Sequence, residues 1–394
     1  MILTYQFRLL PSKKQWRVLE SLLESQRLLY NAALEERIGA YRHGVALTYI
    51  DQCKGLTEWR QTDADAASVA VNLHRGTLKR LEEAYKGFFR RAKLRAGKAG
   101  FPRFRGKGRW NSFAFREFRG ISFDGGRLRF KGMPGAIKVH VHRKMPEHAP
   151  IRSCTLRRDS KGWKVGFCVD VSVGHPRKGE RSVGVDLGIS TFAALSDGGF
   201  IPSLRAARRA QRQLRVAQRA LSRKSRRSKS RCKARTQIAR CHAAVARARS
   251  NFLHQASARL VRDYDVIAIE ALNVRGLARS ALARDVHDAS WAKFISFVTY
   301  KAAKAGARLI EVNPVNSSQM CSGCGVMVHK DLRQRSHHCP HCGLSLDRDL
   351  NAARNILGRA GMGPCLPNVA DCGQRAGGNL VWSEGQAQSP GRAS

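Results

Sequence analysis

Four cysteines arranged as two pairs constrain the fold of this chain more than any other feature. They follow the pattern C-x2-C-x14-C-x2-C and are Cys321, Cys324, Cys339 and Cys342. Each pair fits a tight turn that directs both sulfurs at one point, and a glycine follows each pair. Four thiolates at this spacing are typical of a closed, tetrahedral Zn2+ site, whereas a redox dithiol would explain only one pair. The pattern therefore predicts a zinc ribbon with one structural Zn2+ ion and no open position for catalysis.

The charge of the chain is far from balanced. Its 394 residues include 72 Lys and Arg against 29 Asp and Glu, which gives a net charge of +43. Such a surface repels itself unless a polyanion neutralises it, and nucleic acid is the leading candidate because each contacted phosphate releases a condensed counterion. Hydrophobic residues make up 43% of the chain. That is enough for the cores of two or three domains, so a natively unfolded chain is excluded.

A membrane partner is not expected. No apolar run reaches the ~18 residues of a membrane span, and the chain opens with MILTYQFRLLP rather than with a signal peptide. An anionic membrane surface is the weaker alternative, because no basic amphipathic anchor accompanies a hydrophobic face. We therefore expect a cytoplasmic protein.

Two segments concentrate the basic residues. Residues 86–120 interleave Lys and Arg with Phe and Trp, and we expect Arg103, Arg105 and Arg119 to contact nucleic acid. For the aromatic residues, the alternative is core packing at a domain junction. Residues 201–250 hold 17 Lys and Arg and no acid, with apolar residues at helical spacing. Because like charges four residues apart destabilise a helix, we expect direct contact with nucleic acid rather than a solvated pair of basic helices.

The order of the expected elements indicates a multidomain α/β protein with a β-barrel. A strand over residues 2–9 precedes helices over 12–92, the second of which spans about 64–92. Residues 120–175 contain short apolar-polar alternations joined by tight turns, which suggests a small barrel that the first strand could complete. After residue 181, apolar strands alternate with helices.

Three acids stand out in this second half. Asp186 lies in SVGVDLGIS, Glu270 ends the apolar part of VIAIEALNV, and Asp349 or its neighbour Asp347 lies in LDRDLNAARNIL. A buried acid is unfavourable unless it is paired or holds a cation, and for each acid alone a salt bridge to an arginine is the alternative. Three carboxylates at one point can hold two Mg2+ or Mn2+ ions ~3.5–4 Å apart. One ion would activate water to attack phosphorus, and the other would stabilise the leaving 3′ oxygen.

These motifs occur in the same order in a known family. The segments VGVDLGIS, IEALNV, SSQMCSGCG, CPHCG and LDRDLNAARNIL, with the basic FPRFRGK segment, resemble TnpB (OrfB), the transposon-encoded RNA-guided DNA nucleases related to type V CRISPR effectors. The resemblance covers nearly the whole chain, and the motifs are specific in combination. It implies a wedge-type β-barrel split by a helical recognition domain, followed by an RNase H-like RuvC nuclease domain with an inserted zinc ribbon.

The resemblance also implies domain boundaries. The expected parts are the wedge-type barrel (1–11 and 119–178), the helical recognition domain (12–118), the RuvC domain (179–315 and 344–360), the zinc-ribbon target nucleic-acid-binding subdomain (316–343) and a tail (361–394). The tail is rich in Gly, Pro, Gln and Ser, and we expect it to lack fixed structure.

In the family, each RuvC motif supplies one catalytic acid. By resemblance, these acids fall on Asp186, Glu270 and Asp349, which would bind two Mg2+ or Mn2+ ions. Asp349 is preferred over Asp347 because it directly precedes LNAARNI, as in the family motif. The basic residue before the third cysteine falls on Arg335, which would contact a phosphate near the cut.

Two departures from the family pattern leave the acids intact. His337 stands where the family often has an aromatic residue, and Leu346 stands where it often has His. The resemblance therefore implies an active endonuclease. Its guide would be a noncoding RNA from the transposon end, and its target would be double-stranded DNA. The protein itself would read a short motif beside the target, for which the helix with Asn72, Arg75 and Lys79 is our candidate.

Three other functions remain open at this point. A guided regulator that blocks transcription without cutting would be marked by the loss of a catalytic acid, and none is lost. A transposase would join DNA ends through the same acids. A nonspecific RNA-binding protein would explain the charge but not the acids and their order. We expect a monomer within the ribonucleoprotein.

Overall fold

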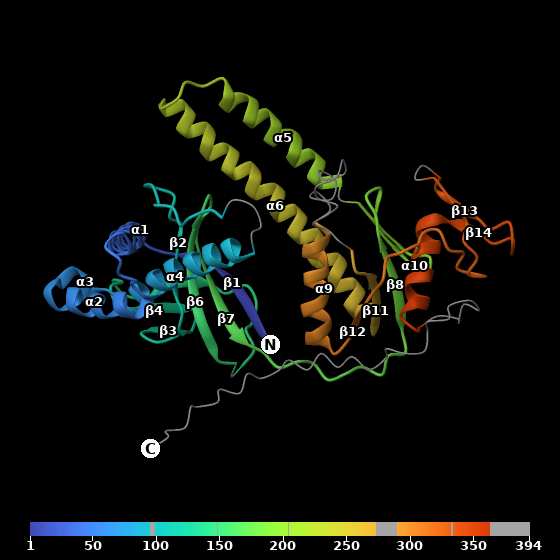
Figure 1. Cartoon of the computed structure of the whole chain (residues 1–394), viewed down its shortest axis with the longest axis horizontal. Coiled ribbons are helices and arrows are strands. Elements are labelled where there is room, and N and C mark those ends of the chain that lie inside the picture. The colour runs from blue at the N-terminus through green and yellow to red at the C-terminus, as the bar shows by residue number, and fades with distance from the viewer. Residues whose placement is uncertain (95–98, 148, 204, 273–289, 332–333, 363–394) are drawn as a thin grey trace, which may run out of the picture. The chain divides into compact units, whose positions relative to one another are not determined.

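The computed structural model describes the chain in two compact units (Figure 1). It describes residues 1–394 except 95–98, 148, 204, 273–289, 332–333 and 363–394, and the side chains of 205–210 are also outside the description. The first unit contains Met1–Ser172 and Val216–Ala243, and the second contains Val173–Arg215 and Ala244–Ser394. Nearly all of the tail expected to lack fixed structure lies outside the described residues.

A seven-stranded antiparallel sheet forms the base of the first unit. Its strand order is β2-β6-β7-β1-β5-β4-β3. The strands are β1 (Ile2–Leu10), β2 (Ser112–Phe115), β3 (Ile121–Asp124), β4 (Arg127–Phe130), β5 (Ile137–His140), β6 (Ile151–Asp159) and β7 (Gly162–Asp170). The first strand pairs with β5 on one side and with β7 on the other, so it joins the two halves of the sheet as expected.

This sheet curls until it is nearly a closed barrel. Phe115 of the edge strand β2 lies 5.2 Å, between ring centroids, from Phe130 of β4, next to the opposite edge. Phe123 of the other edge strand, β3, lies 4.6 Å from Phe167 of β7. Rings from distant strands meet because alternate side chains point to one inner face. The expected small barrel is confirmed, and its sheet includes β2, which precedes the boundary expected at residue 119.

Four helices belong to the same unit as the barrel. They are α1 (Lys13–Arg42), α2 (Tyr49–Thr62), α3 (Ala64–Ser68) and α4 (Val71–Lys93). Residues of α1, α2 and α4 share the hydrophobic core of the barrel. Ser12 begins α1 with a capping box, in which Gln15 N–H donates to Ser12 Oγ and Ser12 N–H donates to Gln15 Oε1. The single helix expected over 64–92 is wrong. The chain is extended at Val69 and Ala70, so a short α3 precedes α4 there.

A five-stranded sheet of order β10-β9-β8-β11-β12 organises the second unit. The strands are β8 (Ser182–Leu187), β9 (Thr191–Leu195), β10 (Phe200–Pro202), β11 (Val266–Glu270) and β12 (Arg308–Val312). β8, β11 and β12 run parallel, and β9 and β10 form an antiparallel edge. All five residues of β11 are buried, which is typical of a parallel strand covered on both faces.

Helices cover both faces of this sheet. They are α6 (Lys229–Asp263), α9 (Trp291–Ala305) and α10 (Arg348–Arg359). Ile267 and Ile269 of β11 belong to a core that includes residues of α9 and the C-terminal part of α6. Ala268, on the opposite face, packs with Ile356 of α10. The alternation along β11 therefore places α10 on the face toward which Ala268 and Glu270 point.

Two further elements complete the described fold. Figure 1 shows α5 (Arg205–Ser222) and α6 running side by side as a helical hairpin. Arg231 stabilises the tip of this hairpin, because the Arg231 guanidinium donates hydrogen bonds to the carbonyls of Leu221 and Lys224. A ribbon of β13 (Ser336–His338) and β14 (Ser345–Asp347) contains the second cysteine pair between its strands. In the described part of the chain, no helix is long and apolar enough to span a membrane.

Candidate catalytic acids and cysteine cluster

Strand register places two of the expected acids side by side. β8 and β11 are parallel, and Ile269 lies opposite Val185. The next residue of each strand is Glu270 and Asp186, so both side chains point to the same face of the sheet. That face is the one covered by α10. Two acids separated by 84 positions in the sequence are thus brought together by one pair of hydrogen-bonded strands.

The first turn of α10 supplies the third acid. Asp347 is the N-cap of this helix, and its carboxylate accepts hydrogen bonds from the backbone N–H groups of Asp349 at 2.8 Å and Leu350 at 3.1 Å. This capping role occupies Asp347. Asp349 is the second residue of the helix, and its charge raises the pKa of Asp186 more than the charge of Asp347 does. The geometry therefore favours Asp349 over Asp347 as the partner of Asp186 and Glu270.

The acids influence one another electrostatically. Burial, and then the charges of Glu270 and Asp349, raise the pKa of Asp186 to about 8, against an opposing effect of Arg348. Burial also raises the pKa of Glu270, whereas a hydrogen bond donated by Ser317 Oγ to its Oε1 lowers it. Carboxylates that burial and like charges keep from ionising are stabilised when a cation joins them.

The donor set of this acid cluster fits magnesium or manganese. Carboxylate oxygens are the ligands that these hard cations prefer. The cluster, defined as Asp186, Glu270 and Asp349, is more open than the cysteine cluster. Within the described residues, only the four cysteines form a group of three or more metal-ligating side chains with ligand atoms within 4.8 Å of one another.

The cysteine cluster, defined as Cys321, Cys324, Cys339 and Cys342, fits a single zinc ion. The Sγ atoms of Cys321 and Cys342 lie 3.6 Å apart, as do those of Cys324 and Cys339. Tetrahedral Zn2+ with Zn–S bonds of about 2.3 Å requires sulfurs about 3.8 Å apart. Backbone N–H groups of Cys342 and His341 contribute to lowering the pKa of the Cys339 thiol to about 6, whereas burial raises the pKa of Cys321 and the pKa of Cys324 is raised to about 12. The sulfurs are thus gathered in the arrangement that the spacing predicted.

Two arginines flank Asp349. Arg348 donates to Asp349 Oδ1 at 3.2 Å, and its own side chain is largely buried. Arg335, which the resemblance assigned to a phosphate, lies with its Nη1 atom 3.7 Å from Asp349 Oδ2. More than half of the Arg335 side chain is exposed, so it remains accessible to a ligand beside the acid cluster.

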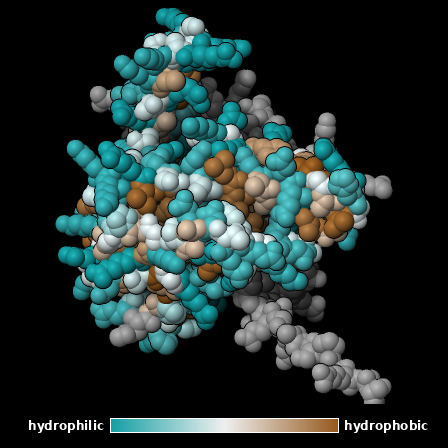
Figure 2. Space-filling model, turned by 90° about the vertical axis from the view of Figure 1, so that its left-hand side faces the viewer, coloured by the Kyte–Doolittle hydropathy of each residue, from teal (hydrophilic) through white to brown (hydrophobic). Residues whose placement is uncertain are grey.

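The other residues expected to contact nucleic acid lie in the first unit. Arg75, Arg103, Arg105 and Arg119 are exposed. Asn72 Nδ2 donates to the carbonyl of Arg119 at 3.0 Å. Figure 2 shows one face of the molecule, on which hydrophilic residues predominate and hydrophobic residues form small separate patches.

Lys79 and the basic loop at 99–109 are held by specific contacts. The ammonium group of Lys79 lies 4.8 Å from the centre of the Tyr49 ring. Asn31 pairs with the backbone of Arg105, accepting from its N–H at 2.8 Å and donating to its carbonyl at 3.0 Å. Phe101 contacts Tyr85 and Phe88, so part of the expected aromatic set packs together, whereas Phe104 is 54% exposed. Packing among aromatic residues therefore applies to Phe101, whereas contact between Phe104 and nucleic acid stays a prediction.

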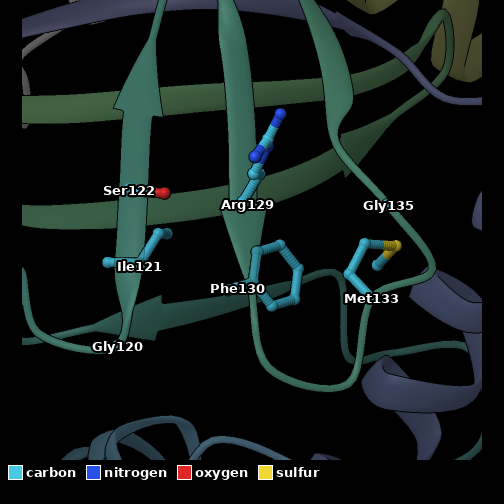
Figure 3. Close-up of a pocket in the computed structure, with 7 residues that line it drawn as sticks. All are labelled: Gly120, Ile121, Ser122, Arg129, Phe130, Met133 and Gly135. Atoms are coloured by element: carbon cyan, nitrogen blue, oxygen red, sulfur yellow. The ribbon is translucent and has the colours of Figure 1, made fainter.

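A cavity of about 520 Å³ in the first unit is distinct from all of these residues (Figure 3). Figure 3 shows Ser122 on one strand and Arg129 on the next, with Met133 on the following loop. The lining residues are Gly120, Ile121, Ser122, Arg129, Phe130, Met133 and Gly135. They include one cation and no acid, so they offer no ligand set for a divalent metal.

Several residues around the acids were not anticipated. Ser317 hydrogen-bonds to Glu270, and Asn351 and Asn355 are buried polar residues of α10. Their signal in the sequence is the spacing of the two asparagines in LNAARNIL, which places both on one helix face. Ser317 opens the segment SSQMCSGCG, but its role is not visible there, because its contact with Glu270 joins residues 47 positions apart.

Family models and known proteins match this chain over most of its length. The matching models are described as "Probable transposase" over residues 166–281, "Helix-turn-helix domain" over 1–45 and "Cas12f1-like, TNB domain" over 291–356. In the structure, residues 1–45 contain the strand β1 and the single helix α1.

Curated relatives cover nearly the same range. The "Putative RNA-guided DNA endonuclease" of Streptomyces pristinaespiralis is 34% identical over 365 residues, covering 90% of this chain and 88% of that protein. The "Putative RNA-guided DNA endonuclease InsQ" of Escherichia coli K12 is 28% identical, covering 90% and 91%.

A solved structure shows the same fold. The cryo-EM structure of a Cas12f1–sgRNA–target DNA complex matches with a TM-score of 0.55 and 14% identity, covering 88% of this chain and 83% of that chain. With the barrel, the motif order and these relatives established, the chain belongs to the TnpB (OrfB) family of transposon-associated proteins.

Proposed function

We propose that this protein is an RNA-guided DNA endonuclease of a transposable element that cuts target DNA by two-metal-ion hydrolysis. The observation that carries the proposal is the convergence of Asp186, Glu270 and Asp349 on one face of the second sheet. The names of the relatives, and the guide RNA and target DNA in the complex of similar fold, support it. The second unit would then be a RuvC-type nuclease domain with an inserted zinc ribbon.

The side chains have distinct roles in this proposal. Two divalent ions at the acid cluster would activate a water and stabilise the leaving 3′ oxygen of the phosphodiester. Ser317 holds one oxygen of Glu270 by a hydrogen bond, so that carboxylate is fixed in orientation. Arg335 is exposed beside Asp349 and would hold a phosphate of the strand being cut. The cysteines would hold one structural Zn2+ and shape the ribbon without taking part in the chemistry.

The positively charged residues away from the acid cluster would bind nucleic acid. We infer that the hairpin of α5 and α6, together with Arg103, Arg105 and Arg119, contacts the phosphates of a guide noncoding RNA and of double-stranded target DNA. The start of α4, with Asn72, Arg75 and Lys79, would read a short motif beside the target. The guide would read the rest by base pairing. We propose a monomer within a cytoplasmic ribonucleoprotein.

A cleavage assay with purified components tests the proposal. Wild-type protein, its co-purified RNA and a matching DNA duplex should give breaks that depend on Mg2+ or Mn2+, and Asp186→Ala should remove them. Equal cutting by wild type and Asp186→Ala would refute the nuclease. Target binding without cutting by the wild type would instead indicate a regulator, and strand-transfer products would indicate a transposase.

A further inference from the structure

Side chains on one face of α10 hydrogen-bond to the segment that leads into Cys321, the first cysteine of the cysteine cluster. Asn351 Nδ2 donates to the carbonyl of Met320 at 2.7 Å. Asn355 Nδ2 donates to the same carbonyl at 2.8 Å and to that of Ser317 at 2.8 Å. Arg359 Nη1 donates to the carbonyl of Asn313 at 2.7 Å. The three helix residues are four positions apart, so they lie on one face and hold residues 313–320 along it.

Ser317 within this segment contacts the acid cluster, and the chain just after the segment enters the cysteine cluster. Next to Cys321, the backbone N–H of Ser322 donates to Asn351 Oδ1 at 2.9 Å. Three residues before Met320, Ser317 donates its hydroxyl to Glu270 Oε1 and is itself buried. A continuous set of hydrogen bonds therefore joins the cysteine cluster to the acid cluster through Asn351, Asn355 and Ser317.

These hydrogen bonds are strong constraints because they are buried. Asn351 is 0% exposed and Asn355 is 1% exposed. Leaving a buried amide without its hydrogen-bond partner lowers the stability of the folded state by about 1–3 kcal/mol. The hydrogen bonds therefore hold α10 and residues 313–320 in one arrangement. Asp349 lies in the first turn of the same helix, so an arrangement that fixes the segment also relates Asp349 to Glu270.

We propose that Ser317 and Asn355 are positioning residues that couple metal loading of the cysteine cluster to divalent-metal affinity at the acid cluster. Zinc at the four cysteines orders the segment that follows Asn313, which sets the Ser317 hydroxyl against Glu270. Without zinc, the ribbon loosens and Glu270 loses this hydrogen bond. The inference rests on the proposed function only in taking the acid cluster as a divalent-metal site. By linkage, divalent metal at the acids must equally favour zinc at the cysteines.

Mn2+ binding to the full-length protein, without nucleic acid, tests the coupling directly. The free Mn2+ signal is measured by electron paramagnetic resonance at fixed pH, for zinc-loaded and zinc-stripped wild type. We expect Mn2+ affinity to fall at least about fivefold on zinc removal, the lower end of ordinary coupling between sites. Equal Mn2+ affinity in the two forms, with circular dichroism showing both folded, would overturn the proposal.

Variants keep the test decisive if zinc removal unfolds more than the ribbon. In zinc-loaded protein, Ser317→Ala and Asn355→Ala should weaken Mn2+ binding about fivefold while one zinc ion per chain is retained. Arg354→Ala, on the exposed side of α10, is the matched control and should bind Mn2+ like wild type. Wild-type Mn2+ affinity in both Ser317→Ala and Asn355→Ala would contradict the coupling. Absence of any Mn2+ site sensitive to Asp186→Asn would instead contradict the proposed nuclease.

Discussion

Gly184 of β8 lies directly against the backbone of Ala353 in α10. A side chain at Gly184 would overlap the Ala353 carbonyl oxygen, and its Cβ would lie 2.8 Å from the backbone nitrogen of Leu357. The missing side chain therefore lets α10 approach the strand that carries Asp186, two residues further on. This close approach places Asp349, in the first turn of the same helix, beside that strand.

Gly184→Ala is therefore expected to move α10 away from the sheet. The overlap is with backbone atoms, which cannot rotate away, so we expect a loss of about 1–3 kcal/mol in unfolding free energy and weaker Mn2+ binding. Gly358→Ala is the matched control, because nothing lies within 4 Å of a Cβ there. Its stability should be unchanged or higher by up to about 1 kcal/mol, since Ala favours a helix over Gly. Thermal melts of both variants measure the difference, and equal behaviour would show that α10 tolerates the displacement.

Asp186→Asn should stabilise the metal-free protein near neutral pH. The pKa of Asp186 is raised to about 8 in the folded state, so the folded chain holds a proton that the unfolded chain has released. Stability of the metal-free protein therefore falls as pH rises from about 4 to about 8. A shift of one pKa unit corresponds to about 1.4 kcal/mol of unfolding free energy. Recovering that much in Asp186→Asn would raise the Tm by roughly 2–4 °C.

The pH profile of the Tm difference measures this effect. The gain of Asp186→Asn over wild type should be small at pH 4 and largest at pH 8, and added Mg2+ should reduce it by stabilising only the wild type. Glu311→Gln, an exposed acid on β12, is the control and should show no such profile. A Tm difference between Asp186→Asn and wild type that does not change with pH would mean that folding does not raise the pKa of Asp186.

His74 should make the first unit less stable in mild acid. Its ring is buried, and burial followed by the charge of Arg60 lowers its pKa to about 4. Below about pH 6.5 the unfolded chain takes up a proton that the folded chain refuses until about pH 4, so stability is lost as pH falls through this range. The loss attributable to His74 reaches at most about 3 kcal/mol.

Urea unfolding at pH 7 and pH 4.5 tests this prediction. His74→Gln should reduce the difference in unfolding free energy between the two pH values, although the variant can be less stable at both. His43→Gln changes an exposed histidine and should retain the wild-type difference. If the unfolding free energies of His74→Gln and His43→Gln depend equally on pH, the buried ring of His74 is not the cause of the acid sensitivity.

Cys321→Ala should remove zinc and unfold the ribbon locally. Cys321 is fully buried, and its Sγ lies 3.6 Å from that of Cys342. Loss of one of four thiolates lowers zinc affinity strongly, and binding free energy at such a site is also folding free energy. Metal analysis should show one zinc ion per wild-type chain and less than one in the variant. A strong chelator should lower the Tm of wild type and of the control Cys232→Ser, whose cysteine is exposed in α6. A chelator-insensitive wild type would contradict a structural zinc.

The hairpin tip should contribute to RNA affinity mainly through phosphates. Arg226 and Arg227 are exposed between α5 and α6. The double variant Arg226→Gln/Arg227→Gln should weaken RNA binding and reduce the slope of log affinity against log salt by about 1 for each phosphate that is no longer neutralised. Lys54→Gln, on exposed α2, is the control. Fluorescence anisotropy over a salt series measures both, and identical slopes would place the RNA elsewhere.

Much of the fold follows from local patterns. The strand alternation predicted the small barrel, and the first strand completes it by pairing with β5 and β7. Local signals did not reveal the break at Val69 and Ala70, because neither residue is a strong helix breaker. Nor did they include β2 in the sheet, since its residues lie within the basic, aromatic segment 86–120 and its partner β6 is about 40 positions away in the sequence.

The sequence by itself determined the chemistry that is available: four thiolates at a zinc spacing, acids at the ends of apolar segments and a large excess of positive charge. These follow from residue identity and short-range spacing, which a linear chain displays directly. The tertiary structure decided what only distance can decide: that β8 and β11 are neighbours, that Gly184 admits α10, and that Ser317 reaches Glu270. Such contacts join residues tens of positions apart, and their geometry depends on packing that no local pattern encodes.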